Sequence, residues 1–350
     1  MTIAVSTQTR PTPDLVVLVG GQSLADFLTY TGAGDAFIAA LRTHSDTPDL
    51  SGALAFVELV DQATGGSFAV KAHADAETAL TGLPTSYWYN IAGSASGPLL
   101  TAAVSAIGAL SAKPTIIVWD QGQADTAAAS GAVDGISAAT AAADYKTATE
   151  AIFSALRSAC NPGSPTSVPI FMAPLGRRAS SSPSLGYEAI RQKQLEIIAG
   201  GTNIHRALEV YDLDLQDVVH PNRAGRRIYG TRIAETVARI SLGGDDIFAG
   251  PSISGVTLDN STTLRVAISV EAGDSLVKPA NPYGFRVEQS GSQVPVASMA
   301  WSGNDLLLTL ASPVTTPDLF FPYDFVADFD PAKTITGSVS GKPLQSWHRA

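Results

Sequence analysis

The chain has 350 residues, of which 45% are hydrophobic and 31 are glycine, and its formal net charge is −10 at pH 7. A chain of this length and hydrophobicity can bury a large core. The acidic balance disfavours nucleic acid and anionic membrane surfaces as partners, because binding to either depends on positive charge. Cys160 is the single cysteine, which excludes an internal disulfide and a cysteine-based zinc site. We expect it to be a buried structural thiol.

The N-terminal residues predict a polar arm rather than a targeting segment. Residues 1–13 lack the basic start and the apolar stretch of a signal peptide, and Pro11 and Pro13 close them. No segment approaches the apolar length of a membrane span, so we expect no membrane insertion. The cellular location stays open between the cytoplasm and association with a particle.

Short apolar runs alternate with helical patterns over residues 14–244. The run LVVLVGGQSL, residues 15–24, predicts a strand buried on both faces that ends at a small polar residue. The alternation predicts a doubly wound parallel sheet. Further strands are predicted at 53–60, 67–73, 115–119, 168–174 and 206–213, and helices at 98–112, within 126–160 with an interruption near Gly131 and Gly135, at 184–200 and at 222–242.

The helical periodicity ends near residue 245. Short runs such as TLRVAISV, GFRVEQ and LLLTLA follow, separated by Gly, Pro, Asn and Ser clusters. This pattern is typical of a small antiparallel sandwich. We therefore predict an α/β domain over residues 14–244 and a β-sandwich-like domain over residues 245–350.

Ser23 directly follows the first predicted strand of the sheet. Ligands of open α/β sheets gather beyond the carboxyl ends of the strands, so a serine there can present its hydroxyl to a cleft. Gly20 and Gly21 allow the chain to turn without a Cβ clash. A Gly-Gly turn followed by serine as a helix N-cap is the alternative.

Four polar stretches lie at predicted strand ends or in the loops beyond them, and could supply one cleft. They are residues 21–23, 90–97, 119–125 and 217–222. Nucleophilic acyl transfer needs a hydroxyl, an imidazole and an orienting carboxylate, and Ser23, His220 and Asp217 can fill these roles. The Ser23 backbone N–H, a glycine N–H and a side-chain amide would suit the developing oxyanion.

The blocks GGQSL, NIAGSASG, WDQGQAD and DVVHPN, in this order and spacing, resemble those of the SGNH/GDSL hydrolases. They look most like the sialate O-acetylesterase and acetylxylan esterase branch. The resemblance implies a flavodoxin-like three-layer α/β/α domain, followed by the small β-sandwich. It implies a carbohydrate O-acetylesterase that acts through an acyl-enzyme intermediate on an acetylated carbohydrate or polysaccharide, without a metal or cofactor.

The resemblance also implies a role for each site residue. Ser23 would be the nucleophile, His220 the general base and then acid, and Asp217 its orienting carboxylate. Gln121 would take the place of the oxyanion-hole asparagine of other branches. Gly93 and Gly97 both fit the glycine donor, and we prefer Gly93 because it directly precedes a serine, as in this branch.

Two positions depart from the branch pattern. Leu24 stands where the branch has Asn, and Gln123 stands where it has Glu, which removes a charge from the cleft. An alternative is therefore a glycan-binding or adhesion protein on an esterase scaffold, for example a spike or fibre component of a phage-like particle. A lipase or thioesterase is a third interpretation, since a fold alone does not fix the acyl donor.

Further polar and aromatic residues near these blocks are candidates for substrate contact. Arg177 and Arg178 follow the strand predicted at 168–174 and could hold an anionic sugar group at the cleft rim, but solvated surface arginines are the interpretation that the sequence favours. The aromatic run at 87–89 fits either a sugar platform or core packing. The other substrate-binding candidates are Gln22, Gln123 and Asp125.

Overall fold

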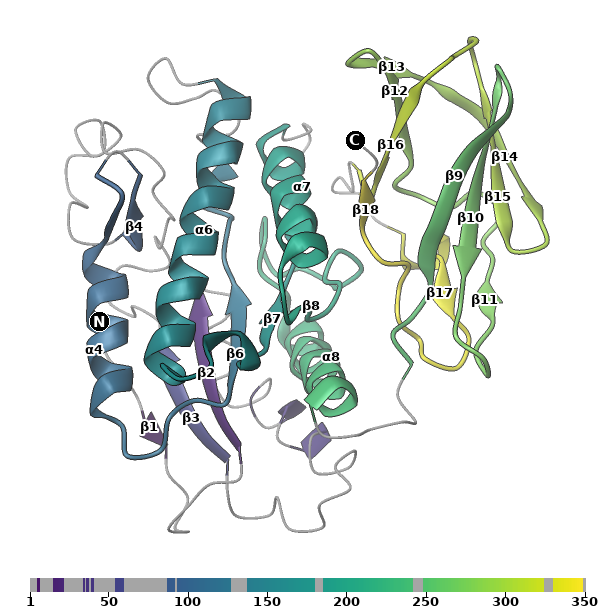
Figure 1. The fold of residues 1–350 in the computed structure, drawn as a ribbon. Helices are drawn as coiled ribbons and strands as arrows, with labels where there is room; N and C mark the ends of the chain where they lie inside the picture. Colours follow the sequence, from purple (N-terminus) through teal and green to yellow (C-terminus); the bar gives the residue numbers. More distant parts are fainter. Residues whose placement is uncertain are drawn as a thin grey trace. The chain divides into compact units, whose positions relative to one another are not determined.

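The chain is a mixed α/β protein that divides into two compact units (Figure 1). The first comprises Met1–Leu175, Ser184–Leu208 and His220–Asp245, and the second comprises Gly176–Pro183, Glu209–Val219 and Asp246–Ala350. The domain limits at residues 14–244 and 245–350 stay a prediction, and each unit is described by itself. The computed structural model describes residues 5–6, 15–21, 34, 36–37, 39–40, 54–59, 87–91, 93–126, 137–179, 185–241, 248–323 and 330–348.

The first unit contains a mostly parallel sheet, with helices along it. Its strands are β1 (Val5–Ser6), β2 (Leu15–Gly21), β3 (Leu54–Leu59), β6 (Ile116–Asp120), β7 (Ile170–Met172) and β8 (Ile204–Arg206), with a hairpin of β4 (Tyr89–Asn90) and β5 (Ala95–Ser96). Its helices are α4 (Pro98–Ala109), α6 (Ala138–Cys160), the short 3₁₀ helix η3 (Pro165–Ser167), α7 (Leu185–Gly200) and α8 (Arg223–Ser241).

Among the described residues, the sheet has the order β1-β3-β2-β6-β7-β8. Strands β3, β2, β6, β7 and β8 run parallel, and β1 pairs antiparallel with β3. Residues 16–19 of β2 and the whole of β6 are buried, as expected for strands covered on both faces. The predicted strands at 15–24, 53–60, 115–119 and 168–174 are confirmed in their described parts, whereas 67–73 lies outside the described residues.

The strand predicted at 206–213 is wrong. Strand β8 comprises only Ile204–Arg206, and the chain leaves the sheet after Ala207, whose N–H donates to the Met172 carbonyl at 2.8 Å. From Glu209 the chain belongs to the second unit. The apolar side chains of Val210, Tyr211 and Leu213 are therefore buried in the second unit, and not beside the parallel sheet as the pattern predicts.

Helices α4, α6 and α7 run beside one another along the sheet (Figure 1). Helix α6 buries a stripe that includes Ala141, Tyr145, Ala148 and Ile152, the spacing of one helix face. Its N-cap is Ser137, whose Oγ accepts from the Thr140 N–H at 3.1 Å. The predicted helices at 98–112, 184–200 and 222–242 are confirmed, and the described part of 126–160 is helical from residue 138. Within the described residues, no helix is long and apolar enough to cross a membrane.

The second unit is rich in antiparallel sheet. Its strands are β9 (Ser252–Asn260), β10 (Thr263–Ser269), β11 (Leu276–Val277), β12 (Arg286–Gln289), β13 (Ser292–Val294), β14 (Val296–Ser302), β15 (Asp305–Leu310), β16 (Pro317–Phe321), β17 (Thr336–Gly337) and β18 (Trp347–His348), and η4 (Pro331–Lys333) is a 3₁₀ turn. Two sheets, β14-β15-β10-β9 and β13-β12-β16-β18, contribute side chains to one hydrophobic core. Strand β10 shows the alternation that this packing requires, with Leu264, Val266 and Ile268 buried.

The segment Glu209–Val219 is fixed to the second unit by buried polar contacts. The Glu209 carboxylate accepts from the Ser346 N–H at 2.8 Å and from the Ser346 hydroxyl. The Tyr211 hydroxyl donates to the Leu344 carbonyl at 2.6 Å, and its ring packs edge-on against Phe321. A segment that lies between β8 and α8 in the chain is thereby part of the core of the other unit.

Substituting Glu209→Gln should destabilise the protein. The amide offers one acceptor oxygen and turns its NH₂ group towards a donor, so a buried hydrogen bond is lost at a cost of about 1–3 kcal/mol. Urea unfolding at pH 7 would measure the change, with the exposed Glu150→Gln on α6 as the matched control. Equal midpoints for the two variants would contradict this account of the segment.

Candidate functional site

The parallel sheet reverses its strand order at β2. Strand β3 lies on one side of β2, whereas β6, β7 and β8 follow in chain order on the other side. Ligands of open α/β sheets bind beyond the carboxyl ends of the strands at such a reversal. Gly21 and Asp120 end the two strands there, and they are paired in the sheet register. The topology therefore places the candidate site beside this pair.

Both glycines of β2 are needed for the close approach of the strands. A Cβ on Gly20 would lie 2.8 Å from the Trp119 ring, closer than carbon atoms pack. Gly21 has φ +136°, and a Cβ there would overlap the Asp120 carbonyl. Gly21 therefore has a backbone conformation that favours glycine, as the predicted turn after the strand requires. Gln22, Ser23 and Leu24 lie outside the described residues.

Asp120 is a buried carboxyl group held by two neutral donors. Its side chain is 1% exposed, and the Tyr229 hydroxyl of α8 donates to Oδ2 at 2.8 Å. The Gln123 amide donates to Oδ1 at 3.2 Å. Burial raises the pKa of Asp120 to about 6, against the lowering effects of these two hydrogen bonds and of the positive charge of His220. A carboxyl group that titrates near neutrality at a strand end is typical of functional sites.

His220 immediately precedes helix α8. Asn222 caps this helix, since its Oδ1 accepts from the Gly225 N–H at 2.9 Å, and the Arg226 side chain donates to the Pro221 carbonyl at 3.0 Å. These bonds fix the chain directly after His220, which is half-buried. The charge of His220 is among the causes that lower the pKa of Asp120. The meeting of the four polar stretches in one cleft stays a prediction.

The loop after β6 is held by two helices. The Gln121 carbonyl accepts from the Tyr145 hydroxyl of α6 at 3.0 Å and from the Gln194 amide of α7 at 2.8 Å. Burial raises the pKa of Tyr145 further above its ordinary value, as do the charges of Asp125 and Asp120. The Gln121 side-chain amide donates to Asp125 at 2.5 Å. The role of Gln121 as an oxyanion donor stays a prediction. To fill it, the amide would have to donate to the oxyanion as well as to Asp125, or instead of it.

The glycine block forms the hairpin β4–β5. The Gly93 N–H donates to the Asn90 side chain at 2.9 Å, whereas the Gly97 N–H donates to the Trp88 carbonyl at 2.8 Å. The Asn90 side chain can rotate away more easily than the Trp88 main-chain carbonyl can. Gly93 is therefore better able to release its N–H for a ligand, although its role stays a prediction.

The remaining candidates have different surroundings. Asp217 is exposed, and its Oδ1 accepts from the Val219 N–H at 3.0 Å. Arg177 is 9% exposed and donates to the Leu213 carbonyl at 3.0 Å, so its interpretation as a solvated surface arginine is wrong. Trp88 is buried and packs edge-on against Trp119 at 5.0 Å, as the core-packing alternative predicts. The roles of Asp217 and Arg177 towards substrate stay predictions.

Sequence reasoning missed four residues that shape the site. Asp120 stood within the WDQGQAD block at a predicted strand end, so its position was available as a signal. Tyr145, Gln194 and Tyr229 lie inside helical patterns, where a polar residue facing inward has no local signature.

Cys160 is buried as expected, and burial raises the pKa of its thiol to about 12. Among the described residues, no group of three or more His, Cys, Asp or Glu side chains could hold a metal ion.

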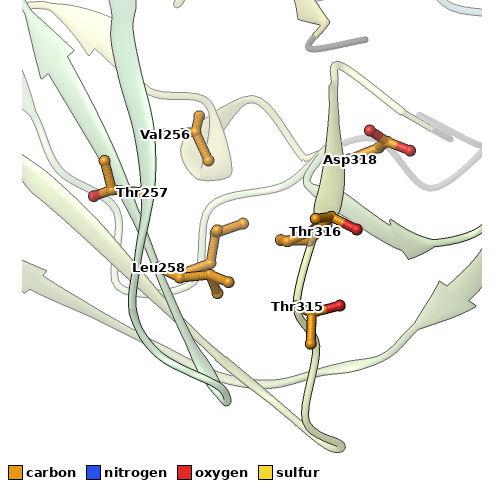
Figure 2. Close-up of a pocket in the computed structure, with 8 residues that line it drawn as sticks. Val256, Thr257, Leu258, Thr315, Thr316 and Asp318 are labelled. Atoms are coloured by element: carbon orange, nitrogen blue, oxygen red, sulfur yellow. The ribbon is translucent and has the colours of Figure 1, made fainter.

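A separate pocket of about 430 Å³ lies in the second unit, between β9 and the start of β16 (Figure 2). Figure 2 shows aliphatic groups of Val256 and Leu258 opposite Thr315 and Thr316. The lining residues include neither a histidine nor a serine. This pocket therefore lacks a nucleophile and base pair, and the carboxyl ends of β2 and β6 remain the candidate site.

Comparison with solved structures shows an esterase-like fold. A carbohydrate acetylesterase from Xanthomonas citri aligns with a TM-score of 0.60 at 15% identity, over 92% of this chain and 66% of that chain. This chain thus corresponds to about two thirds of the length of that structure. A protein from Arabidopsis thaliana aligns with a TM-score of 0.40 at 18% identity, over 61% of this chain and 70% of that one. No protein-family profile and no curated protein sequence matches the chain.

The buried carboxyl group predicts a specific dependence of stability on pH. Between pH 4 and 6 the folded protein holds a proton on Asp120 that the unfolded chain has released, so this group's contribution to stability is full below pH 4 and is lost as the pH rises through 6. The loss is about 3 kcal/mol for a shift of about two pH units. The measurement is the free energy of unfolding of wild type and Asp120→Asn at pH 4 and pH 7.5. The difference between the two proteins should change by this amount, and parallel pH curves would contradict it.

Proposed function

We propose that the protein is a carboxylic ester hydrolase that removes acetyl groups from a carbohydrate, with Ser23 as nucleophile. The observation that carries the proposal is the reversal of strand order at β2, where Gly21 pairs with the buried Asp120 at the carboxyl ends of β2 and β6. Ser23 follows Gly21 by two residues in the sequence and lies outside the described residues, so its role is proposed from the sequence blocks.

The strand order supports a flavodoxin-like arrangement of the first unit. In chain order the parallel strands are arranged 2-1-3-4-5, the doubly wound order in which ligands bind between the first and third strands. The acetylesterase of similar fold supports ester hydrolysis and an acetylated carbohydrate as substrate. Membership of the SGNH family, and of its sialate O-acetylesterase branch, is proposed because of the four sequence blocks.

The proposed reaction is acyl transfer in two steps. The Ser23 oxygen attacks the acetyl carbon while His220 takes the hydroxyl proton, and that proton then goes to the departing sugar oxygen. In the second step a water molecule attacks the acetyl carbon of the acyl-enzyme while His220 takes its proton. His220 then returns that proton to the Ser23 oxygen as acetate leaves. Asp217 would orient His220, and the N–H groups of Ser23 and Gly93 and the Gln121 amide would stabilise the oxyanion. Gln22, Gln123, Asp125 and Arg177 are the proposed contacts to the sugar.

Turnover of an aryl acetate and release of acetate from acetylated sugars test this function. Ser23→Ala should lower kcat/KM by about 10³-fold or more, because the nucleophile is lost. Ser154→Ala, at an exposed position on α6, is the matched control and should retain wild-type turnover.

Two results would contradict the proposal in different ways. Equal turnover by wild type and Ser23→Ala would exclude Ser23 as the nucleophile. Retention of glycans without release of acetate from any of them would favour the glycan-binding alternative. Release of long acyl chains in preference to acetate would favour a lipase or thioesterase.

A further inference from the structure

Helix α8 concentrates positive charge in an acidic chain. The chain has a formal net charge of −10, whereas the sequence of α8, RAGRRIYGTRIAETVARIS, holds one acidic residue and no lysine. Its positive residues are Arg223, Arg226, Arg227, Arg232 and Arg239. A local excess of one charge attracts the opposite charge at short range even where the net charge of the protein repels it.

Four exposed side chains form one patch on the solvent face of the first two turns of α8. We call it the α8 patch, and its members are Arg223, Ala224, Arg227 and Ile228. Residues four apart on a helix are neighbours, so Arg223 lies beside Arg227 and Ala224 beside Ile228. Ile228 is 44% exposed. The patch therefore presents two guanidinium groups next to an apolar surface.

The two arginines of the patch are unfavourable for the helix itself. Like charges four residues apart repel each other, and positive side chains in the first turn oppose the helix dipole. Among the residues that the structure describes, neither Arg223 nor Arg227 forms an ion pair. A bound anion would relieve this repulsion, which a neutral ligand would leave in place.

A hydrogen bond places this part of α8 at the candidate site. The Tyr229 hydroxyl donates to Asp120 at the carboxyl end of β6, at 2.8 Å. Arg227 and Arg223 precede Tyr229 by two and six residues, which is about 3 Å and 9 Å along the helix axis. The Arg226 side chain donates to the Pro221 carbonyl at 3.0 Å and fixes the chain where it enters the helix. The α8 patch therefore lies on the turns of α8 that border the site.

We propose that the α8 patch binds carboxylates of an acidic polysaccharide, and that the acetylated substrate is such a polymer. The assignment of the polymer as substrate rests on the proposed hydrolase function. The binding itself does not, and can be measured without turnover. The planar guanidinium group suits this ligand, because it can donate two parallel hydrogen bonds to one carboxylate.

The composition of the patch favours an acidic polysaccharide over nucleic acid or an anionic membrane. Sugar rings present C–H groups that can pack on Ala224 and Ile228, while their carboxylates pair with the arginines. Nucleic acid and membrane surfaces bind through many positive charges at once, and the net charge of −10 opposes them beyond the patch. An acidic glycan needs only the local pair.

Binding is tested with polygalacturonate, a polyuronate without acetyl groups, by calorimetric titration at low ionic strength. Wild type should bind it, and the double variant Arg223→Gln with Arg227→Gln should weaken the Kd about tenfold or more, because two charge-assisted contacts are lost. Arg239→Gln is the matched control, since it removes one positive charge about 15 Å along the same helix from Tyr229. Its Kd should stay within about twofold of wild type, and neutral dextran should bind to none of the proteins.

Thermal unfolding separates a binding role from a structural one. The double variant removes the repulsion between the two arginines and their conflict with the helix dipole, and glutamine is a good helix former. Its unfolding midpoint should therefore equal or exceed that of wild type. A clearly lower midpoint would show that the arginines support the fold, and would overturn their assignment to a ligand.

The role in the reaction is tested with partially acetylated polygalacturonate and with an aryl acetate. On the polymer, the double variant should raise KM about tenfold with kcat within about twofold, because the patch binds the chain and not the reacting acetyl group. On the neutral aryl acetate, kcat/KM should stay within about twofold of wild type.

The outcomes separate this inference from the proposed function. Equal binding of polygalacturonate by wild type and the double variant, or none by either, would overturn the α8 patch and leave the hydrolase function intact. Tighter binding of duplex DNA or of phosphatidylserine vesicles than of polygalacturonate would overturn the choice of ligand. Turnover by Ser23→Ala equal to that of wild type would overturn the hydrolase function, and the calorimetric titration would then decide the binding alone.

Discussion

The pairing of β2 with β6 is the constraint on which the rest of the site depends. The register sets Gly21 beside Asp120, and the absence of side chains at Gly20 and Gly21 lets the strands approach around Trp119 and the Asp120 carbonyl. Two sequence blocks separated by about a hundred residues thereby meet at one point of the sheet. A Cβ at either glycine would force these strand ends apart.

Burial gives this point its electrostatic character. Asp120 lies between α8 and the β6 loop, with uncharged donors on its oxygens and the charge of His220 near enough to affect its ionisation. The loop itself is anchored by Tyr145 and Gln194 through the Gln121 carbonyl. Helices on the sheet therefore fix main-chain atoms, whereas the side chains of the loop remain as the polar groups of the site. This division of roles suits a site that must hold charge without rearranging.

The sequence predicts the elements well where one local pattern decides them. The apolar runs at β2, β3, β6 and β7 and the helical pattern of α6 are found as predicted in their described parts. The strand at 206–213 is wrong because Glu209 and Tyr211 bond to Ser346 and Leu344, partners far along the chain that no local pattern reveals. Tyr229 was missed for the same reason, since its contact with Asp120 joins residues far apart in the chain. Ser23 lies outside the described residues, so its predicted role rests on the sequence blocks.

The central claim is that His220 activates the hydroxyl of Ser23. The most direct measurement is labelling with a serine-reactive fluorophosphonate followed by peptide mapping, in wild type and in His220→Gln. The account predicts a label on Ser23 in wild type and its loss in His220→Gln. A label on another serine, or equal labelling of Ser23 in both proteins, would contradict it.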